Sequence, residues 1–329
     1  MPDLVTHFYF GEEVYKRLSS KIKDKIVNKE LYDFTTAGPD PFFFYKFLNG
    51  RKNEEVREFG NRMHRTKTRK FFLEMIERCK TSEHKNLMFS YLAGFICHYA
   101  LDSLAHPYVF HKTGEYLKNE ETLIYRGLHT RLERAIDSYI IRCFYLETPW
   151  KYKITKNVLK LKKLPKEIYN DLDKIYLNTY DYPNASRIIN DSIKYQRKFY
   201  NFIYDPVGLK QKLFEKIDNG KSGLDYTTFS YYKKEIYDLD YFNLNRRKWV
   251  NPVNDKISSF DSFWDLFEKA KTKADELIEI AYRYIYENED IELSNHFLNK
   301  SYLTGIDTDL DNAHDMKYYN NIFEEETNA

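Results

Sequence analysis

The sequence predicts an all-α protein, a multi-helix bundle. Glycine supplies only 11 of 329 residues, well below the usual share of about 7%. Apolar residues recur at intervals of three and four along most of the chain, as on one face of a helix. Alternating runs bounded by turn residues, which would indicate strands, are not evident. A chain of this length can bury a large core, and we expect one all-α domain over residues 1–300.

The apolar spacing predicts seven helices, and turn residues separate some of them. The helices are expected at about residues 8–20, 54–79, 84–105, 120–146, 184–203, 206–218 and 259–288. Pro107 is a helix-stop signal for the third. GPDPFFFY, residues 38–45, and NGKSGLDYTT, residues 219–228, are predicted to be loops. Residues 301–329 form an acidic C-terminal tail, which we expect to be solvated.

Composition limits the partners and the compartment. Lys and Arg number 52 against 50 Asp and Glu, a net charge of +2, so the totals carry no strong nucleic-acid signal. The sequence has no window of about 18 consecutive apolar residues, so it predicts no transmembrane segment. The N-terminal stretch MPDLVTHFYFGEE does not resemble a secretion signal. Cys79, Cys97 and Cys143 lie among apolar helix residues, as expected of free thiols in a reducing compartment. We therefore expect a cytoplasmic location.

The stretch HYALDSLAHPYVFH carries the most specific pattern in the chain. His98, Asp102 and His106 recur every four residues and would share one helix face. The two histidines would lie about 12 Å apart along the axis, too far for one zinc ion with ligand bonds of about 2.0–2.2 Å. Either the three form a hydrogen-bonded row, or they bind at least two ions with Asp102 between them. Two-metal hydrolases hold their ions about 3.5–4 Å apart.

Other residues could complete such a site. His129 and Glu133 repeat the four-residue spacing in HTRLERAID, and Asp40 lies between two prolines. His64 lies within a predicted helix, and His7 lies at the start of the first one. Each alone is typical of a packed or surface residue. Together they supply enough ligands for three ions.

The order of these residues resembles the ligand series of the bacterial zinc-dependent phospholipase C family, which is related in fold to the single-strand-specific zinc nucleases. The series is His7, Asp40, His64, His98-x3-Asp102, His106 and His129-x3-Glu133. The resemblance covers residues 1–146, the expected metal-site core, and residues 147–300 would add further helices. It implies a helical bundle that encloses a multinuclear zinc site, and the hydrolysis of a phosphodiester by water activated between two or three Zn²⁺ ions.

The resemblance also implies roles for single residues. Asp40, His64, His98 and Asp102 would hold one zinc, His106, His129 and Glu133 a second, and His7 with Asp102 a third; Asp40 would also be the general base. Exported members complete the third ion's shell with a processed amino terminus, which this sequence does not predict. They also place five residues between the aspartate and the next histidine, whereas His106 follows after three and His111 after eight. We prefer His106, which keeps the row on its helix, and His111 is the alternative.

The sequence indicates the substrate less specifically than it indicates the metal ligands. A phospholipid or a headgroup diester is the expected substrate, with a transient membrane surface as a further partner. Three aromatic residues follow Asp40, namely Phe42, Phe43 and Phe44. They could contact an acyl chain or stack on a base, although we expect them to pack in the core. Arg62, Arg65 and Arg69 could bind phosphate or form an exposed basic face. The alternatives are a single-strand nuclease-like phosphodiesterase and a non-catalytic, zinc-stabilised helical binding protein.

Overall fold

The computed structural model describes residues 3–47, 54–117, 119–217 and 239–323. The all-α prediction is confirmed: twelve α-helices lie among these residues. They are α1 (Leu4–Arg17), α2 (Ser20–Lys23), α3 (Lys29–Thr35), α4 (Glu54–Arg65), α5 (Thr68–Thr81), α6 (Lys85–Thr113), α7 (Leu128–Cys143), α8 (Ile154–Asn157), α9 (Tyr169–Tyr180), α10 (Ala185–Ile203), α11 (Leu209–Ile217) and α12 (Phe263–Tyr282).

Shorter elements connect these helices. The 3₁₀ turns are η1 (Asp40–Phe44), η3 (Leu123–Tyr125), η4 (Pro149–Lys151), η5 (Lys166–Ile168) and η8 (Leu293–Asn295), and a π-helical turn, η7 (Arg283–Glu287), extends α12. Strands β1 (Trp249–Val250) and β2 (Ser258–Ser259) form a small antiparallel pair in which Trp249 lies opposite Ser259. The predicted loop at 38–45 therefore contains the 3₁₀ turn η1, whereas the predicted turn at 219–228 lies outside the described residues.

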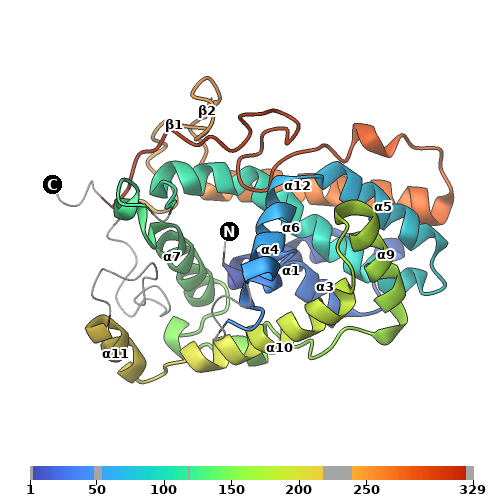
Figure 1. Cartoon of the computed structure of the whole chain (residues 1–329), viewed down its shortest axis with the longest axis horizontal. Helices are drawn as coiled ribbons and strands as arrows, with labels where there is room; N and C mark the ends of the chain where they lie inside the picture. The colour runs from blue at the N-terminus through green and yellow to red at the C-terminus, as the bar shows by residue number, and fades with distance from the viewer. Residues whose placement is uncertain (1–2, 48–53, 118, 218–238, 324–329) are drawn as a thin grey trace.

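Helix α6 is the centre of the fold. It packs against α1, α3, α5, α7 and α12, and α12 runs beside it in Figure 1. By length and composition, α6 is the one helix of the described chain that could cross a membrane, but 89% of its most apolar window is buried inside the protein. A helix that is apolar on every side is typical of the interior of a large bundle.

Several helix boundaries differ from the prediction, and α3 and α9 were not predicted. Two of the differences have a clear physical cause. Pro107 does not end α6, which continues to Thr113. An interior proline costs about 3 kcal/mol, but the residues that follow it are buried and Tyr108 donates a hydrogen bond to the Tyr241 carbonyl at 2.7 Å, so tertiary packing holds the last turns in place. The predicted helix at 54–79 is two helices, because Lys67 adopts a left-handed φ of 57° between α4 and α5.

The expectation of a solvated tail is wrong in part, because Asp309, Asp311 and Asp315 are exposed but other residues of 301–323 pack against the bundle. Tyr302 and Ile322 are buried, and the Ile322 amide donates to the Lys112 carbonyl at the end of α6 at 3.0 Å. Acidic composition suggested solvation, but the aromatic and aliphatic residues between the acids pack onto the bundle and exclude water. Residues 324–329 lie outside the described residues.

Candidate metal centre

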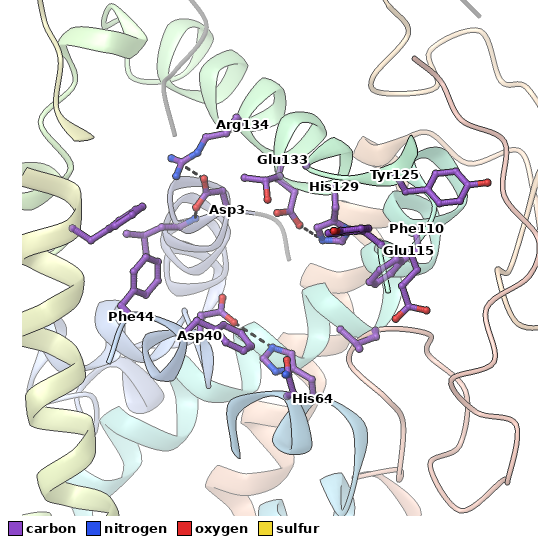
Figure 2. Close-up of a pocket in the computed structure, with 18 of the residues that line it drawn as sticks. Asp3, Asp40, Phe44, His64, Phe110, Glu115, Tyr125, His129, Glu133 and Arg134 are labelled. Carbon is purple, nitrogen blue, oxygen red and sulfur yellow. Dashed lines mark hydrogen bonds and ion pairs between the residues drawn. The ribbon is translucent and has the colours of Figure 1, made fainter. Parts of the chain in front are cut away.

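The fold brings the eight predicted ligands from five elements to one region. They are His7 on α1, Asp40 at the start of η1, His64 on α4, His98, Asp102 and His106 on α6, and His129 and Glu133 on α7. All are buried except His129, whose side chain is 24% exposed. Figure 2 shows Asp40 and His64 on one side of a cavity and His129 and Glu133 on the other.

Three groups of ligand atoms have the spacing that a metal ion requires. The groups are His7, Asp40 and His98; His64, His98 and Asp102; and His106, His129 and Glu133, each with its ligand atoms within 4.8 Å of one another. Ligand atoms around a tetrahedral zinc with bonds of about 2.1 Å would lie about 3.4 Å apart. Asp102 lies 3.2 Å from His7 Nε2 and 3.0 Å from His98 Nε2, which is close to that spacing.

Backbone carbonyls fix the orientation of three of the imidazoles. Nδ1–H of His64 donates to the Gly60 carbonyl at 2.8 Å, that of His98 to Thr36 at 3.2 Å, and that of His106 to Tyr302 at 2.8 Å. A carbonyl can only accept, so Nδ1 carries the hydrogen and Nε2 of the neutral ring presents a lone pair. This hydrogen-bond pattern is common for zinc-binding histidines.

The lone pairs of these rings face carboxylate oxygens, which are also acceptors. Nε2 of His98 faces Asp102, and Nε2 of His64 lies 3.2 Å from Asp40 Oδ1. Among the described residues, His98 Nε2 and both oxygens of Asp102 have no hydrogen-bond partner. Two buried acceptors that face each other are unfavourable unless a proton or a cation lies between them. The donor set therefore fits zinc, which binds imidazole and carboxylate ligands.

Burial keeps three of the imidazoles neutral. It lowers the pKa of His7, His64 and His106 to about 4, so these rings present lone pairs at neutral pH. Burial also raises the pKa of Asp40 well above its usual value, so Asp40 can hold a proton when no cation is near. A neutral imidazole is the form that binds a metal ion.

The three groups border a cavity of about 470 Å³. Asp40, His64, His129 and Glu133 line it, together with Arg134 on α7. Leu4, Phe43, Phe44, Phe110, Phe199, Tyr200 and Leu303 supply its apolar walls. Such a cavity, apolar with a few convergent polar groups, is typical of a small-molecule site.

Comparison with known proteins identifies a family for this chain. The family of zinc-dependent phospholipase C proteins matches residues 6–203, more than half of the chain. This chain belongs to the zinc-dependent phospholipase C family. No curated protein and no solved structure matches it. The match begins before His7 and extends beyond the predicted core at residue 146, and it includes all eight predicted ligands.

The geometry of the site differs in part from the expected ligand sets. His106, His129 and Glu133 gather as one group, as expected for the second ion. The other two expected sets are less separate, because His98 belongs to both remaining groups and Asp40 is close to His7. His111 lies in no metal-binding group of the described residues; its Nδ1–H donates to the Tyr318 carbonyl at 3.1 Å.

The aromatic and basic residues considered in the sequence have different positions. Phe42 is buried in the core, as expected from the sequence for all three, whereas Phe43 and Phe44 line the cavity. Arg65 also lines it and pairs with Glu115 at 3.2 Å. Arg62 instead donates to the Tyr180 carbonyl at 2.6 Å, away from the cavity.

A second polar group beside the metal ligands was missed in the sequence. Arg134 pairs with Asp3 at 2.8 Å, and Tyr200 donates to Asp3 at 3.0 Å; Figure 2 shows Asp3 and Arg134 together beside the cavity. Asp137 on α7 accepts hydrogen bonds from the Val5 and Thr6 amides. Arg134 directly follows Glu133, and Asp137 lies one turn later, so helical spacing from Glu133 could have indicated both.

Proposed function

We propose that this protein hydrolyses the phosphodiester bond of a phospholipid, on the glycerol side of the phosphate, with two or three bound zinc ions. The observation that carries the proposal is the convergence of three ligand groups on one cavity. The zinc-dependent phospholipase C family supplies the reaction class. The apolar walls of the cavity support a lipid as substrate.

Different members of the eight residues would bind different ions. His106, His129 and Glu133 would hold one ion, and Asp102 would bridge the others with His7, His64, His98 and Asp40 as further ligands. When bound, zinc would lower the pKa of water and neutralise charge on the phosphoryl oxygens. The carbonyls of Gly60, Thr36 and Tyr302 would keep the imidazoles oriented toward the ions.

The protein's own residues would bind the substrate and move the proton. Asp40, whose carboxylate faces the cavity, would accept a proton from the attacking water as the new P–O bond forms. The bond between phosphorus and the glycerol oxygen would break, and the leaving oxygen would take up the proton that Asp40 accepted, giving a diacylglycerol and a phosphorylated headgroup. Arg134, whose guanidinium pairs with Asp3, lines the cavity wall, and its N–H groups would also donate to the phosphoryl oxygens of a diester.

Metal content and hydrolysis test the proposal together. Protein purified without chelator should contain two or three zinc ions per chain and hydrolyse phosphatidylcholine and a nitrophenyl phosphodiester. Asp102→Asn should reduce kcat/KM by at least about 100-fold, because even a residue behind a metal ligand contributes about 10–100-fold. Asp311→Asn, an exposed change in the C-terminal segment, is the matched control and should leave both zinc content and rate unchanged.

Other outcomes would point to the alternative functions. Protein without bound metal would overturn the proposal. Cleavage of single-stranded DNA in preference to lipid would indicate a nuclease. Bound zinc that raises thermal stability without hydrolysis of any diester would indicate a zinc-stabilised binding protein.

We also propose a cytoplasmic location. Cys79, Cys97 and Cys143 are free thiols, and the first two are buried. Free thiols persist in a reducing compartment. Cell fractionation with an antibody to the chain tests this, and recovery in the culture medium would contradict it.

A further inference from the structure

A strip of lysines follows α7 and contrasts with the nearly balanced charge of the whole chain. Residues 151–163 contain six lysines and no acidic residue, whereas the net charge of the chain is only +2. The lysine strip consists of Lys151, Lys153, Lys156, Lys160, Lys162 and Lys163, and all six are exposed. Within the described part of the chain, none of them forms an ion pair with an acid. The positive charge of the strip is therefore available to a partner.

The apolar residues of this segment hold the strip in place. Ile154, Val158, Leu159, Leu161 and Leu164 are buried, while the lysines between them face solvent. Because the backbone is anchored by the buried residues, the lysines form a fixed basic surface and not a loose tail.

Helix α11 exposes an apolar stripe. Leu209, Leu213 and Ile217 are spaced by four residues and are 69%, 54% and 48% exposed, so they share one face. Phe214 lies on another face of the helix and is buried, and its ring centroid is 6.3 Å from that of Phe202. The helix is therefore seated by one face and presents leucine and isoleucine side chains to solvent on the other. Lys212 and Lys216 are exposed on the same helix.

The lysine strip and the apolar stripe are neighbours at the end of α10. Thr155, between Lys153 and Lys156 of the strip, donates to Asn201 at 2.8 Å, and the Tyr204 hydroxyl donates to the Lys151 carbonyl at 3.4 Å. Asp205 then accepts from the Gly208 and Gln211 amides and so starts α11. Figure 1 shows α11 just beyond the end of α10. We call the strip and the stripe together the docking surface.

The docking surface is connected to the cavity through α10. Gln196, Phe199 and Tyr200 of this helix line the cavity, and the same helix ends at Ile203, six residues before Leu209. Helix α11 lies beyond the region that matches the family, which ends at residue 203. The stripe therefore lies outside the matched region and follows it closely in the sequence.

We propose that the docking surface binds an anionic lipid bilayer, with the apolar stripe inserted among the headgroups and the lysines above it. A helix with exposed leucines on one side and lysines beside them is typical of interfacial membrane binding, and basic residues near the surface attract anionic lipids. A polyanion without an apolar interior, such as nucleic acid, would pair with the lysines but leave the stripe in water. The inference deepens the proposed lipid hydrolysis and rests on it for the substrate.

Vesicle binding by the full chain tests the docking surface. The protein should co-sediment with vesicles of phosphatidylcholine containing about 30 mol% phosphatidylserine, more weakly with pure phosphatidylcholine, and more weakly at about 0.5 M than at about 0.1 M NaCl. The triple change Lys160→Glu, Lys162→Glu and Lys163→Glu should weaken binding by on the order of fivefold or more per lysine. Lys70→Glu, Lys256→Glu and Lys317→Glu, all exposed elsewhere, are the matched control for charge.

The apolar stripe needs its own variant. Leu209→Ser, Leu213→Ser and Ile217→Ser together should abolish the binding that persists at high salt, because that part comes from insertion. Val27→Ser, Leu298→Ser and Leu310→Ser remove side chains that are 55%, 41% and 54% exposed and should bind as the wild type does. Turnover of a soluble nitrophenyl diester should be unchanged in every variant.

Four results would overturn the inference, and the first three concern binding to vesicles or to a second copy. The first is that the wild type binds neither kind of vesicle, and the second is that the stripe variant binds vesicles at high salt as tightly as the wild type does. The third is a wild-type dimer in light scattering that is lost in the stripe variant, since a second copy of the chain would then cover the stripe. Tighter binding to a single-stranded oligonucleotide than to vesicles would also contradict it. Vesicle binding without hydrolysis of any diester would leave docking supported and refute the proposed function, so the two failures are distinguishable.

Discussion

At the scale of single residues, Gly38 shows how closely the backbone surrounds a candidate ligand. It has a left-handed φ of 49°, which glycine adopts without strain. A Cβ at this position would lie 2.3 Å from Cδ2 of the His98 ring. The glycine therefore serves two purposes: it allows the turn before Asp40, and it leaves room for the imidazole shared by two ligand groups.

A methyl group at this position should disturb the metal site. Gly38→Ala should displace the His98 ring and weaken zinc binding by about 10–100-fold, similar to the loss of a residue that orients a ligand. Equilibrium dialysis against a zinc-buffered solution measures the effect. Gly114→Ala is the matched control, because Gly114 also has a positive φ, of 68°, and its Cβ would lie 2.3 Å from the Tyr125 ring. Equal loss of zinc in both variants would contradict the assignment.

At the scale of elements, the start of α1 is fastened to α7. The Asp137 carboxylate accepts from the Val5 amide at 3.2 Å, the Thr6 amide at 2.8 Å and the Thr6 hydroxyl at 2.6 Å. The first amides of a helix have no partner within the helix, so this buried acid satisfies two of them. His7 is the next residue of α1, and Glu133 lies one turn earlier on α7. Asp137 thus connects two candidate ligand helices.

Neutralising this acid should loosen α1 against α7. In Asp137→Asn an amide replaces the carboxylate, so one donor faces another, and the free energy of unfolding should fall by about 1–3 kcal/mol. Zinc should dissociate faster, which release into a chromogenic chelator would show. Ser138→Ala, at the adjacent buried position, is the control and should release zinc as the wild type does. An unchanged release rate in Asp137→Asn would limit the role of Asp137 to fold stability.

At the scale of the whole molecule, sequence reasoning succeeded where the information was local. The row of His98, Asp102 and His106 required only the helical period, and the all-α class required only composition and apolar spacing. Pro107 misled because its cost is local, whereas the packing that outweighs it comes from residues distant in sequence, such as Tyr241. The prediction for the C-terminal segment failed for a related reason. Its acidic composition can be seen in the sequence, but its burial depends on the surface of the bundle that it packs against.

The carbonyls that accept hydrogen bonds from the ligand imidazoles also include both local and distant partners. Gly60 lies one turn before His64, so helix geometry could have indicated that hydrogen bond. The carbonyls of Thr36 and Tyr302 reach His98 and His106 from 62 and 196 residues away. Sequence spacing cannot reveal such pairs. The orientation of the imidazoles is therefore a property of the complete fold, including the segment after residue 300.

This arrangement makes the stability of the metal-free protein depend on pH. His7, His64 and His106 have a pKa of about 4 in the folded protein because burial disfavours the charged ring, against about 6.5 in an unfolded chain. As pH falls from about 6.5 to about 4, the unfolded chain binds protons that the folded protein does not. Stability is then fully present above this range and decreases through it. Asp40 and Asp137 oppose the trend, since burial raises the pKa of both carboxyls and so favours the folded state as pH falls. His129, whose pKa is lowered by burial, acts in the same sense as the three histidines.

We expect the urea midpoint of chelator-treated protein to fall steadily between neutral pH and about pH 5. His106→Gln should give a flatter dependence, because one of the histidines that resists protonation is gone. His296→Gln, an exposed position, should give a curve parallel to that of the wild type. A midpoint that stays constant or rises over this range would mean that the imidazoles are protonated in the folded protein, and would remove the lone pairs on which the zinc site depends.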